Sequence, residues 1–137
     1  MSRYLIDTNV VSELRKGDRA NEGVRDWFTT DDEKELWLSV LVVGELRRGV
    51  ERIARRDAAA ADSIGTWLRL LVDDYIDRIL PVDIAVALTW ARLGVPDPVP
   101  VIDGLLAATA RNHDLVLVTR NEANFDATGV QILNPFF

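Results

Sequence analysis

Residues 3–14, which read RYLIDTNVVSEL, contain the pattern that decides the fold. The apolar run at 3–6 predicts a β-strand, and the Asp-Thr-Asn at 7–9 consists of residue types that form turns and cap helices. Apolar residues then recur at helical spacing from 10 to 14. A strand that passes directly into a helix through one polar turn is typical of α/β folds with a parallel sheet.

The rest of the chain repeats this alternation of short apolar strands and amphipathic helices. Further strands are expected at residues 35–39, close to Pro81, at 115–118 and at 130–133, with helices between them, one up to Arg56 and another over 101–112. This order predicts an α/β fold, a three-layer α/β/α sandwich with a mostly parallel central sheet, over one domain of residues 1–137. In the helix after Asp83 we expect an inward face made of Ile84, Ala87, Leu88 and Ala91.

Composition limits the class of protein. The 137 residues are 48% hydrophobic, contain no cysteine and carry a formal charge of −6. Disulfides and thiolate metal sites are therefore excluded, and a large basic surface that wraps nucleic acid is disfavoured. No apolar run approaches the ~20 residues that span a bilayer. Because the first residues lead straight into a strand without signal-peptide features, we expect a cytoplasmic protein and no membrane partner.

Three acidic residues stand where a parallel sheet would place its functional crevice, beyond the carboxyl ends of strands. Asp7 follows the first strand, Glu45 lies in a helix among apolar residues, and Asp103 begins a later helix. Each has an ordinary explanation as well, since Asp7 can cap a helix, Glu45 can lie on the surface and Asp103 is favoured by the helix dipole. Together they form an all-oxygen set of the kind that Mg²⁺ or Mn²⁺ prefers.

The chain resembles PIN-domain ribonucleases in four motifs, which lie in the family's order at residues 4–14 (YLIDTNVVSEL), 39–49 (SVLVVGELRRG), 101–110 (VIDGLLAATA) and 115–121 (LVLVTRN). The resemblance extends over essentially the whole chain. It implies that Asp7, Glu45 and Asp103 are catalytic metal ligands. The implied reaction is hydrolysis of an RNA phosphodiester bond with Mg²⁺ or Mn²⁺.

The fourth motif departs from the family pattern. Many relatives have aspartate where this chain has Asn121, and others have an acid three residues later, where this chain has Asn124. Asn121 is retained as a catalytic residue, because an asparagine can hold a water ligand or donate to phosphate. Thr119 is predicted to orient that water or ligand and to contact the RNA. The departure weakens the case for a second tightly held metal.

The resemblance to VapC-like toxins of type II toxin–antitoxin systems further implies partners. These are a structured RNA substrate, often tRNA, a small cognate antitoxin and a second copy of the chain in a homodimer. The apolar surface for dimerisation is expected among Trp67, Trp90 and the terminal Phe136-Phe137.

A basic run on one helix is a candidate RNA contact. Arg48 and Arg52 share a helical face with Glu45 and are predicted to guide phosphate toward the metal. The alternative is a solvated face with ion pairs at Arg47–Glu51 and Glu51–Arg55. His113, the single histidine, is interpreted as structural at the end of a helix.

Other classes of function remain to be weighed. A receiver-like phospho-acceptor domain also gathers acids around Mg²⁺, but it needs a lysine late in the chain, and the lysines here are Lys16 and Lys34. A non-catalytic PIN-like binding module stays open because of Asn121. A solitary RNA-processing PIN enzyme without an antitoxin stays open as well.

Overall fold

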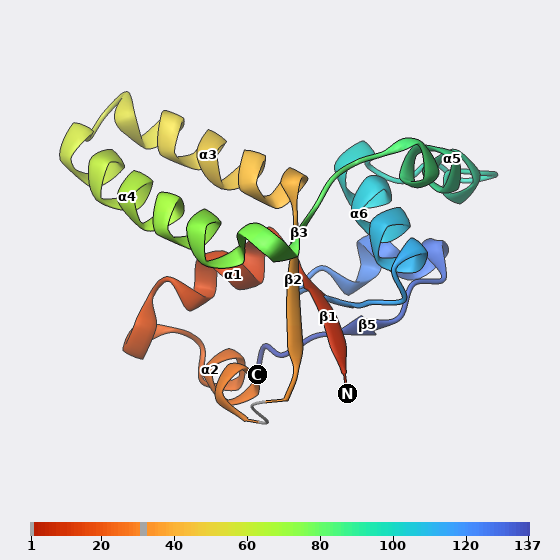
Figure 1. Ribbon diagram of the computed structural model, residues 1–137, viewed down its shortest axis with the longest axis horizontal. Coiled ribbons are helices and arrows are strands. Elements are labelled where there is room, and N and C mark those ends of the chain that lie inside the picture. Colours follow the sequence, from red (N-terminus) through yellow and green to blue (C-terminus); the bar gives the residue numbers. More distant parts are fainter. Residues whose placement is uncertain (1, 31–32) are drawn as a thin grey trace.

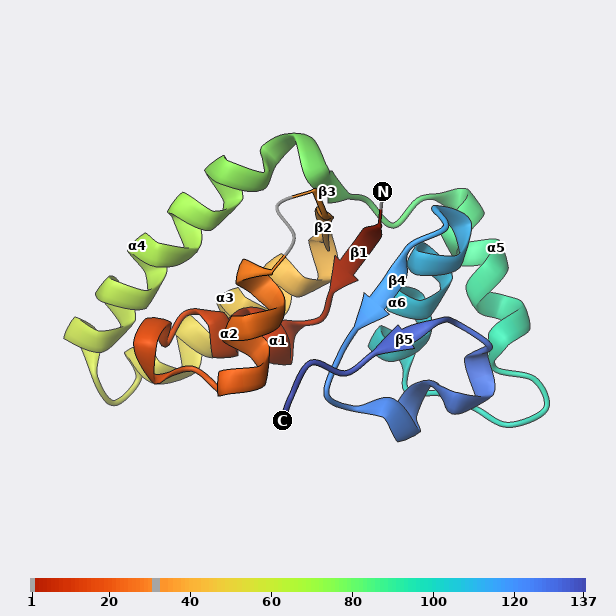
Figure 2. The same ribbon diagram turned by 90° about the horizontal axis from the view of Figure 1, so that it is seen from below.

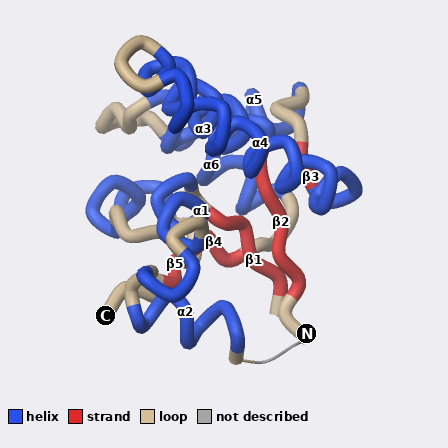
Figure 3. The backbone as a smooth tube through the Cα atoms, turned by 90° about the vertical axis from the view of Figure 1, so that its left-hand side faces the viewer, coloured by secondary structure: helices blue, strands red, loops and turns tan. Residues whose placement is uncertain are grey.

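The computed structural model describes residues 2–30 and 33–137, and its centre is a parallel β-sheet. The strands found in these residues are β1 (Arg3–Ile6), β2 (Glu35–Ser39), β3 (Ile79–Leu80), β4 (Val116–Val118) and β5 (Ile132–Leu133). They lie in the order β3-β2-β1-β4-β5, and each recorded pairing is parallel (Figure 3). The predicted parallel sheet is thus confirmed.

Helices cover both faces of this sheet. They are α1 (Thr8–Leu14), α2 (Glu22–Thr29), α3 (Val40–Ala54), α4 (Ala58–Tyr75), α5 (Ile84–Leu93) and α6 (Val101–Asn112), joined by the short 3₁₀ helices η1 (Gly17–Arg19), η2 (Ile76–Arg78) and η3 (Glu122–Thr128). Figures 1 and 2 show α1 to α4 on one side of the strands and α5 and α6 on the other, which confirms the three-layer sandwich. Among the described residues, no helix is long and apolar enough to cross a membrane.

The core forms where the apolar strands meet small residues of the covering helices. Leu5 of β1, Leu38 of β2 and Leu117 of β4 are almost fully buried. On the other side of the sheet, α6 buries a run from Leu106 to Ala110 that includes three alanines. Small side chains let this helix lie close to the sheet, so the first turn of α6 has a fixed position relative to the end of β1.

The direction in which successive strands are added to the sheet reverses at β1, the middle strand. From β1 the chain crosses through α1 and α2 to β2 on one side, and after β3 it crosses through α5 and α6 to β4 on the other side. In open parallel sheets, such a switch leaves a crevice beyond the carboxyl ends of the two strands concerned. Asp7 directly follows β1 and Thr119 directly follows β4, so both residues begin in that crevice.

The predicted inward face of α5 is wrong. Ile84 is 80% exposed and Leu88 is 60% exposed, and Ala87 and Ala91 are exposed as well. The buried residues of α5 are Val86, Thr89 and Leu93. The helix has apolar residues all round, so its hydrophobic periodicity does not single out one face. Asp83 does cap the helix as predicted, since its side chain accepts from the backbone N–H of Val86 at 2.9 Å.

Candidate active site

Asp7 is a buried carboxylate at the carboxyl end of β1. It occupies the N-cap position of α1 and is 5% exposed. Its Oδ1 accepts from the backbone N–H of Thr8 at 2.7 Å, and its Oδ2 accepts from the Thr119 hydroxyl at 2.8 Å and from Asn9 Nδ2 at 3.3 Å. These donors hold the carboxylate in one orientation and partly offset the cost of its burial.

Glu45 approaches Asp7 from α3. The helix begins after Ser39, whose hydroxyl accepts from the backbone N–H of Leu41, and this places Glu45 in the second turn. Its half-buried side chain accepts a hydrogen bond at Oε1 from the Thr8 hydroxyl at 2.6 Å. Thr8 therefore links the two acids, because its N–H binds Asp7 and its hydroxyl binds Glu45.

Asp103 comes from the first turn of α6, on the far side of the sheet from α3. It is half-buried, and its Oδ2 accepts from Asn124 Nδ2 at 3.1 Å. The next residue, Gly104, lies against the ring of Trp90, where a Cβ atom would come within 2.9 Å of the ring. The absence of a side chain at this position lets Trp90 pack on the turn that carries Asp103.

The three acids influence one another electrostatically. Burial raises the pKa of Asp7, hydrogen bonds from Thr119 and Thr8 lower it, and the negative charges of Asp103 and Glu45 raise it further. Burial also raises the pKa of Asp103, with the charge of Glu45 acting in the same direction. The placement of the three residues agrees with this: Thr8 joins Asp7 to Glu45, and Asp103 lies in the first turn of the helix that leads back to β4. The three acids therefore lie at the carboxyl edge of the sheet.

Whether the three acids fit a divalent cation depends on the chemical type of their ligand atoms and on where their side chains lie. Three carboxylates suit a hard cation such as Mg²⁺ or Mn²⁺, and their mutual repulsion would be relieved by one. Within residues 2–30 and 33–137, however, no three acidic or histidine side chains already form a group that could hold a metal ion. Asp7, Glu45 and Asp103 each bind a neighbouring donor, and they would have to turn toward one another to share an ion.

The turn after β4 supplies two asparagines with different surroundings. Asn121 is exposed, and its backbone N–H donates to the Thr119 hydroxyl at 3.1 Å. Asn124 is the asparagine whose side chain donates to Asp103. Thr119 is fully buried, and its hydroxyl donates to Asp7. Its role in orienting a ligand stays a prediction. The catalytic role of Asn121 stays a prediction.

Sequence reasoning did not identify the Thr8 hydroxyl or Asn9 as parts of the site. Thr8 was interpreted as a helix-capping residue, and its bond to Glu45 joins residues 37 positions apart. Asn9 donates to Asp7 and to Thr119, and its side-chain oxygen accepts from the backbone N–H of Arg120. The one feature of the sequence that could have indicated a role for Thr8 and Asn9 is their position directly after Asp7.

The basic face of α3 lies near the acids, whereas the single histidine lies far from them. Arg48 and Arg52 are exposed, one and two turns after Glu45, whereas Arg47 forms the expected ion pair with Glu51 at 2.6 Å. His113 caps the carboxyl end of α6 and precedes β4, at the opposite edge of the sheet from the acids. The structural interpretation of His113 agrees with this placement.

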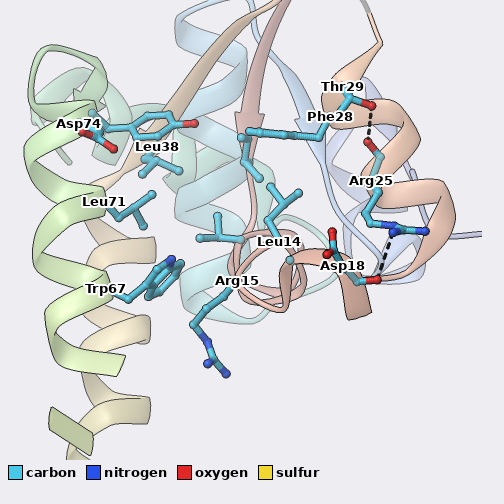
Figure 4. Close-up of a pocket in the computed structure, with 14 residues that line it drawn as sticks. Leu14, Arg15, Asp18, Arg25, Phe28, Thr29, Leu38, Trp67, Leu71 and Asp74 are labelled. Atoms are coloured by element: carbon cyan, nitrogen blue, oxygen red, sulfur yellow. Dashed lines mark hydrogen bonds between the residues drawn. The ribbon is translucent and has the colours of Figure 1, made fainter. Parts of the chain in front are cut away.

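A cavity of about 530 Å³ lies apart from the acids, between α1, α2 and α4. Figure 4 shows Trp67 and Leu71 of α4 on one side of it and Arg25 and Phe28 of α2 on the other. None of the three candidate ligands lines this space. It is an open apolar groove and has no part in the arrangement of the carboxylates.

Known proteins resemble this chain over nearly its full length. It is 31% identical to the toxin FitB of Neisseria gonorrhoeae, over 96% of this chain and 97% of that protein, and 31% identical to the VapC ribonuclease Y4jK of Sinorhizobium fredii, over 96% of each. The crystal structure of FitAcB from Neisseria gonorrhoeae superposes with a TM-score of 0.86 at 31% identity, covering 96% of this chain and 97% of that one. The PIN domain profile matches residues 4–130. The chain therefore belongs to the PIN domain family.

Proposed function

We propose that this protein is a divalent-metal-dependent endoribonuclease and the toxin of a VapBC-like toxin–antitoxin pair that acts in the cytoplasm. The observation that carries the proposal is the gathering of Asp7, Glu45 and Asp103 at one edge of the sheet, where their charges affect one another. Family membership and the names of the relatives, a toxin and a VapC ribonuclease, support the same activity.

The cation would be Mg²⁺ or Mn²⁺, held by the three acids. When bound, it would supply the Lewis acidity that hydrolysis of a phosphodiester requires. The chain's own residues orient the proposed ligands: Thr119 and Asn9 donate to Asp7, and Thr8 donates to Glu45. Asn121, exposed in the turn beyond Thr119, is available to donate to a phosphate oxygen or to a water.

The substrate would be a structured RNA such as tRNA, reached over the face of α3. Arg48 and Arg52 are exposed one and two turns from Glu45, so they can attract phosphates toward the acids in a chain whose net charge is −6. Thr119 acts from inside the site, by fixing Asp7, rather than by touching RNA from the surface, since it is fully buried.

The partner would be a small cognate antitoxin. FitB is named a toxin, and a solved structure that is 28% identical to this chain is described as FitAB bound to a DNA fragment. A short reading frame for a DNA-binding protein beside the gene, and co-purification of its product with this chain, would support the pairing. The absence of such a reading frame would favour a solitary RNA-processing enzyme.

A second copy of the chain is the other proposed partner, and α5 offers the surface. Ile84 and Leu88 are strongly exposed on a helix whose single charge is Arg92. Val82 and Val95, beyond its two ends, are exposed as well. Exposed apolar patches of this kind are common at interaction sites. A surface with so few charges can meet its own copy across a twofold axis. Of the aromatic residues considered from sequence, Trp90 is 36% exposed and Trp67 is half-buried.

The test of the activity is cleavage of RNA by purified, antitoxin-free protein. RNA is incubated with protein and Mn²⁺ or Mg²⁺, with an EDTA control and with DNA of the same sequence. We expect discrete RNA cleavage that EDTA abolishes and little cleavage of DNA. A folded, metal-loaded protein that leaves RNA intact would contradict the proposal and favour the non-catalytic binding module.

A further inference from the structure

The outward side of α5 has the residue spacing of a helix that packs on another helix. Ile84, Ala87, Leu88 and Ala91 follow one another at intervals of one, three or four residues, and all four are exposed. Such spacing forms an apolar stripe, which a surface helix normally packs against its own core. In α5 other residues face the core, so the stripe lies open on the outside of the molecule.

The stripe is arranged symmetrically about the midpoint between Ala87 and Leu88. Ile84 and Ala91 lie on either side of this point, each about 5 Å away along the helix axis, because each residue adds ~1.5 Å. If a second α5 lies antiparallel across a twofold axis through the midpoint, Ile84 of each copy lies opposite Ala91 of the other. A large side chain then meets a small one at both ends of the contact.

At the centre of such a contact, residues meet their own copies. Ala87 lies on one side of the twofold axis and Leu88 on the other, since successive residues are turned by about 100° around a helix. The two Ala87 residues can therefore approach closely, while the two Leu88 side chains contact each other. A contact that contains small side chains allows two helices to pack at the short end of the usual ~8–10 Å between axes.

Charge favours the antiparallel orientation over the parallel one. Arg92 is the one charged residue within α5, near its end, and Asp83 is the N-cap. A parallel pair would place the two arginines together at one end and the two aspartates together at the other. An antiparallel pair places one arginine and one aspartate at each end, and it sets the two helix dipoles in opposite directions.

We infer that two copies of this chain associate through an antiparallel pair of α5 helices, with the twofold axis between Ala87 and Leu88. This inference rests on the homodimer of the proposed function and adds the orientation and the register of the contact. It does not involve the acidic residues, so it can be tested without metal or RNA.

Disulfide cross-linking tests the register, because the chain has no cysteine of its own. The variants are Ile84→Cys, Ala87→Cys and Ala91→Cys, with Leu70→Cys on α4 as the control for random collisions. All four positions are exposed, so each variant should keep the fold. Each full-length variant is oxidised with copper phenanthroline, as is a mixture of Ile84→Cys and Ala91→Cys whose subunits have first exchanged in reducing buffer. Covalent dimer is measured on a non-reducing gel.

We expect Ala87→Cys to form a covalent dimer, because its two copies are offset by only about 1.5 Å along the helices. The mixture of Ile84→Cys and Ala91→Cys should form a dimer that neither variant forms alone. In either variant alone the two cysteines lie about 10 Å apart along the helices, beyond the separation that a disulfide bridges. Leu70→Cys should not cross-link.

Ala87→Leu tests the close approach of the two helices without an added cysteine. The change enlarges the apolar stripe, yet it should raise the dissociation constant of the dimer about tenfold or more, because two bulky side chains would meet at the axis. Ala59→Leu, which adds the same side chain at an exposed position of α4, should leave the dissociation constant unchanged. Sedimentation equilibrium measures the constants, and thermal unfolding checks that both variants fold.

Three results would overturn the inference: a dimeric natural protein whose Ala87→Cys variant does not cross-link, an Ala91→Cys variant that cross-links alone, or an Ala87→Leu variant that associates as tightly as the natural protein. A monomeric natural protein would overturn the proposed homodimer together with this register. These failures are distinguishable from a failure of the proposed ribonuclease activity, which RNA cleavage measures separately.

Discussion

Individual hydroxyl groups fix the acids at this site. Thr119, fully buried after β4, donates to Asp7 and accepts from the backbone N–H of Asn121, while Thr8 donates to Glu45. A buried carboxylate that loses one of its donors loses both orientation and stability. Under the proposed function, the two threonines are positioning residues that act through the carboxylates and not on the substrate.

Replacing Thr119 by valine tests this role, since valine has nearly the same shape and no hydroxyl. We expect RNA cleavage to fall about tenfold or more, as for other residues that orient metal ligands. The free energy of unfolding should fall by about 1–3 kcal/mol because Asp7 stays buried with one donor fewer. Thr119→Ser, which keeps the hydroxyl, should restore most of both. Full activity in the valine variant would show that the hydroxyl does not position Asp7 for catalysis.

The raised pKa of Asp103 predicts how the metal-free protein responds to pH. Burial and the charge of Glu45 raise this pKa above the ordinary value of 3.8, so the folded protein binds the proton more tightly than the unfolded chain. The stability that the proton contributes is present below pH 3.8 and is lost as the pH rises through the raised pKa. Asp103→Asn removes this titration and can still accept the hydrogen bond from Asn124.

The measurement is the melting temperature in EDTA, for the natural protein and for Asp103→Asn. Their difference should shift in favour of the variant between about pH 3.5 and about pH 7, because only the natural protein acquires the charge. Groups remote from Asp103, including Glu13 and Glu35, are common to both proteins and cancel in the difference. Asp7 does not cancel, because the charge of Asp103 raises its pKa, and the loss of that charge shifts the difference in the same direction. A difference that does not change with pH would contradict the raised pKa.

At the scale of elements, α3 carries both Glu45, a proposed metal ligand, and the basic face beside it. Arg48→Gln combined with Arg52→Gln should weaken RNA binding and cleavage and make the affinity less dependent on salt, because fewer counterions are released on binding. The melting temperature should stay the same, since both side chains are exposed. Arg47→Gln, which removes only an exposed ion pair with Glu51, is the matched control. If the double variant cleaved RNA as the natural protein does, Arg48 and Arg52 would have no guiding role.

The sequence predicted the elements well where polar residues mark their ends. The predicted bounds of β1, β2 and α6 are confirmed. Asp7 ends β1, Ser39 ends β2, and the proline-rich loop before Val101 precedes α6, so that each marks the point where one kind of structure gives way to another. The face of α5 could not be predicted, since apolar residues surround that helix and packing alone selects Val86, Thr89 and Leu93.

The candidate site was predicted in its acids but not in its supporting contacts. Asp7, Glu45 and Asp103 stand out because carboxylates follow strands or interrupt apolar helices. The bond between Thr8 and Glu45 and the bond between Asn124 and Asp103 join distant parts of the chain. Such contacts depend on how α3, α6 and η3 pack, which no local pattern encodes.

At the scale of the whole molecule, the sheet separates two surfaces. The acids lie at the carboxyl ends of β1 and β4, and the exposed face of α5 lies on the outer layer formed by α5 and α6 (Figure 2). Dimerisation through α5 would therefore cover apolar surface of this outer layer, beside the turn of α6 that carries Asp103, and would leave Glu45 of α3 on the other layer. A stable dimer buries ~800 Å² per partner, so neighbouring residues such as Val101 and Ile102 would have to contribute.

The oligomeric state tests this arrangement. By light scattering after gel filtration, the antitoxin-free protein should have twice the 15.3 kDa mass of one chain. Ile84→Lys combined with Leu88→Lys should give monomers with an unchanged fold, because the two side chains are 80% and 60% exposed. Leu70→Lys, at a position 59% exposed on α4, should leave the dimer intact. A monomeric natural protein would contradict the proposed dimer.

The most direct test of the central claim is a comparison of RNA cleavage rates for Asp7→Asn, Glu45→Gln, Asp103→Asn and Asp114→Asn with Mn²⁺ present. The first three remove one candidate ligand each. Asp114 is an exposed acid at the opposite edge of the sheet, and its backbone φ of 53° suits asparagine. We predict that each of the first three variants folds and loses nearly all cleavage, while Asp114→Asn cleaves like the natural protein. Cleavage that survives in all three, or that falls equally in Asp114→Asn, would contradict the assignment of this site as a metal-dependent ribonuclease.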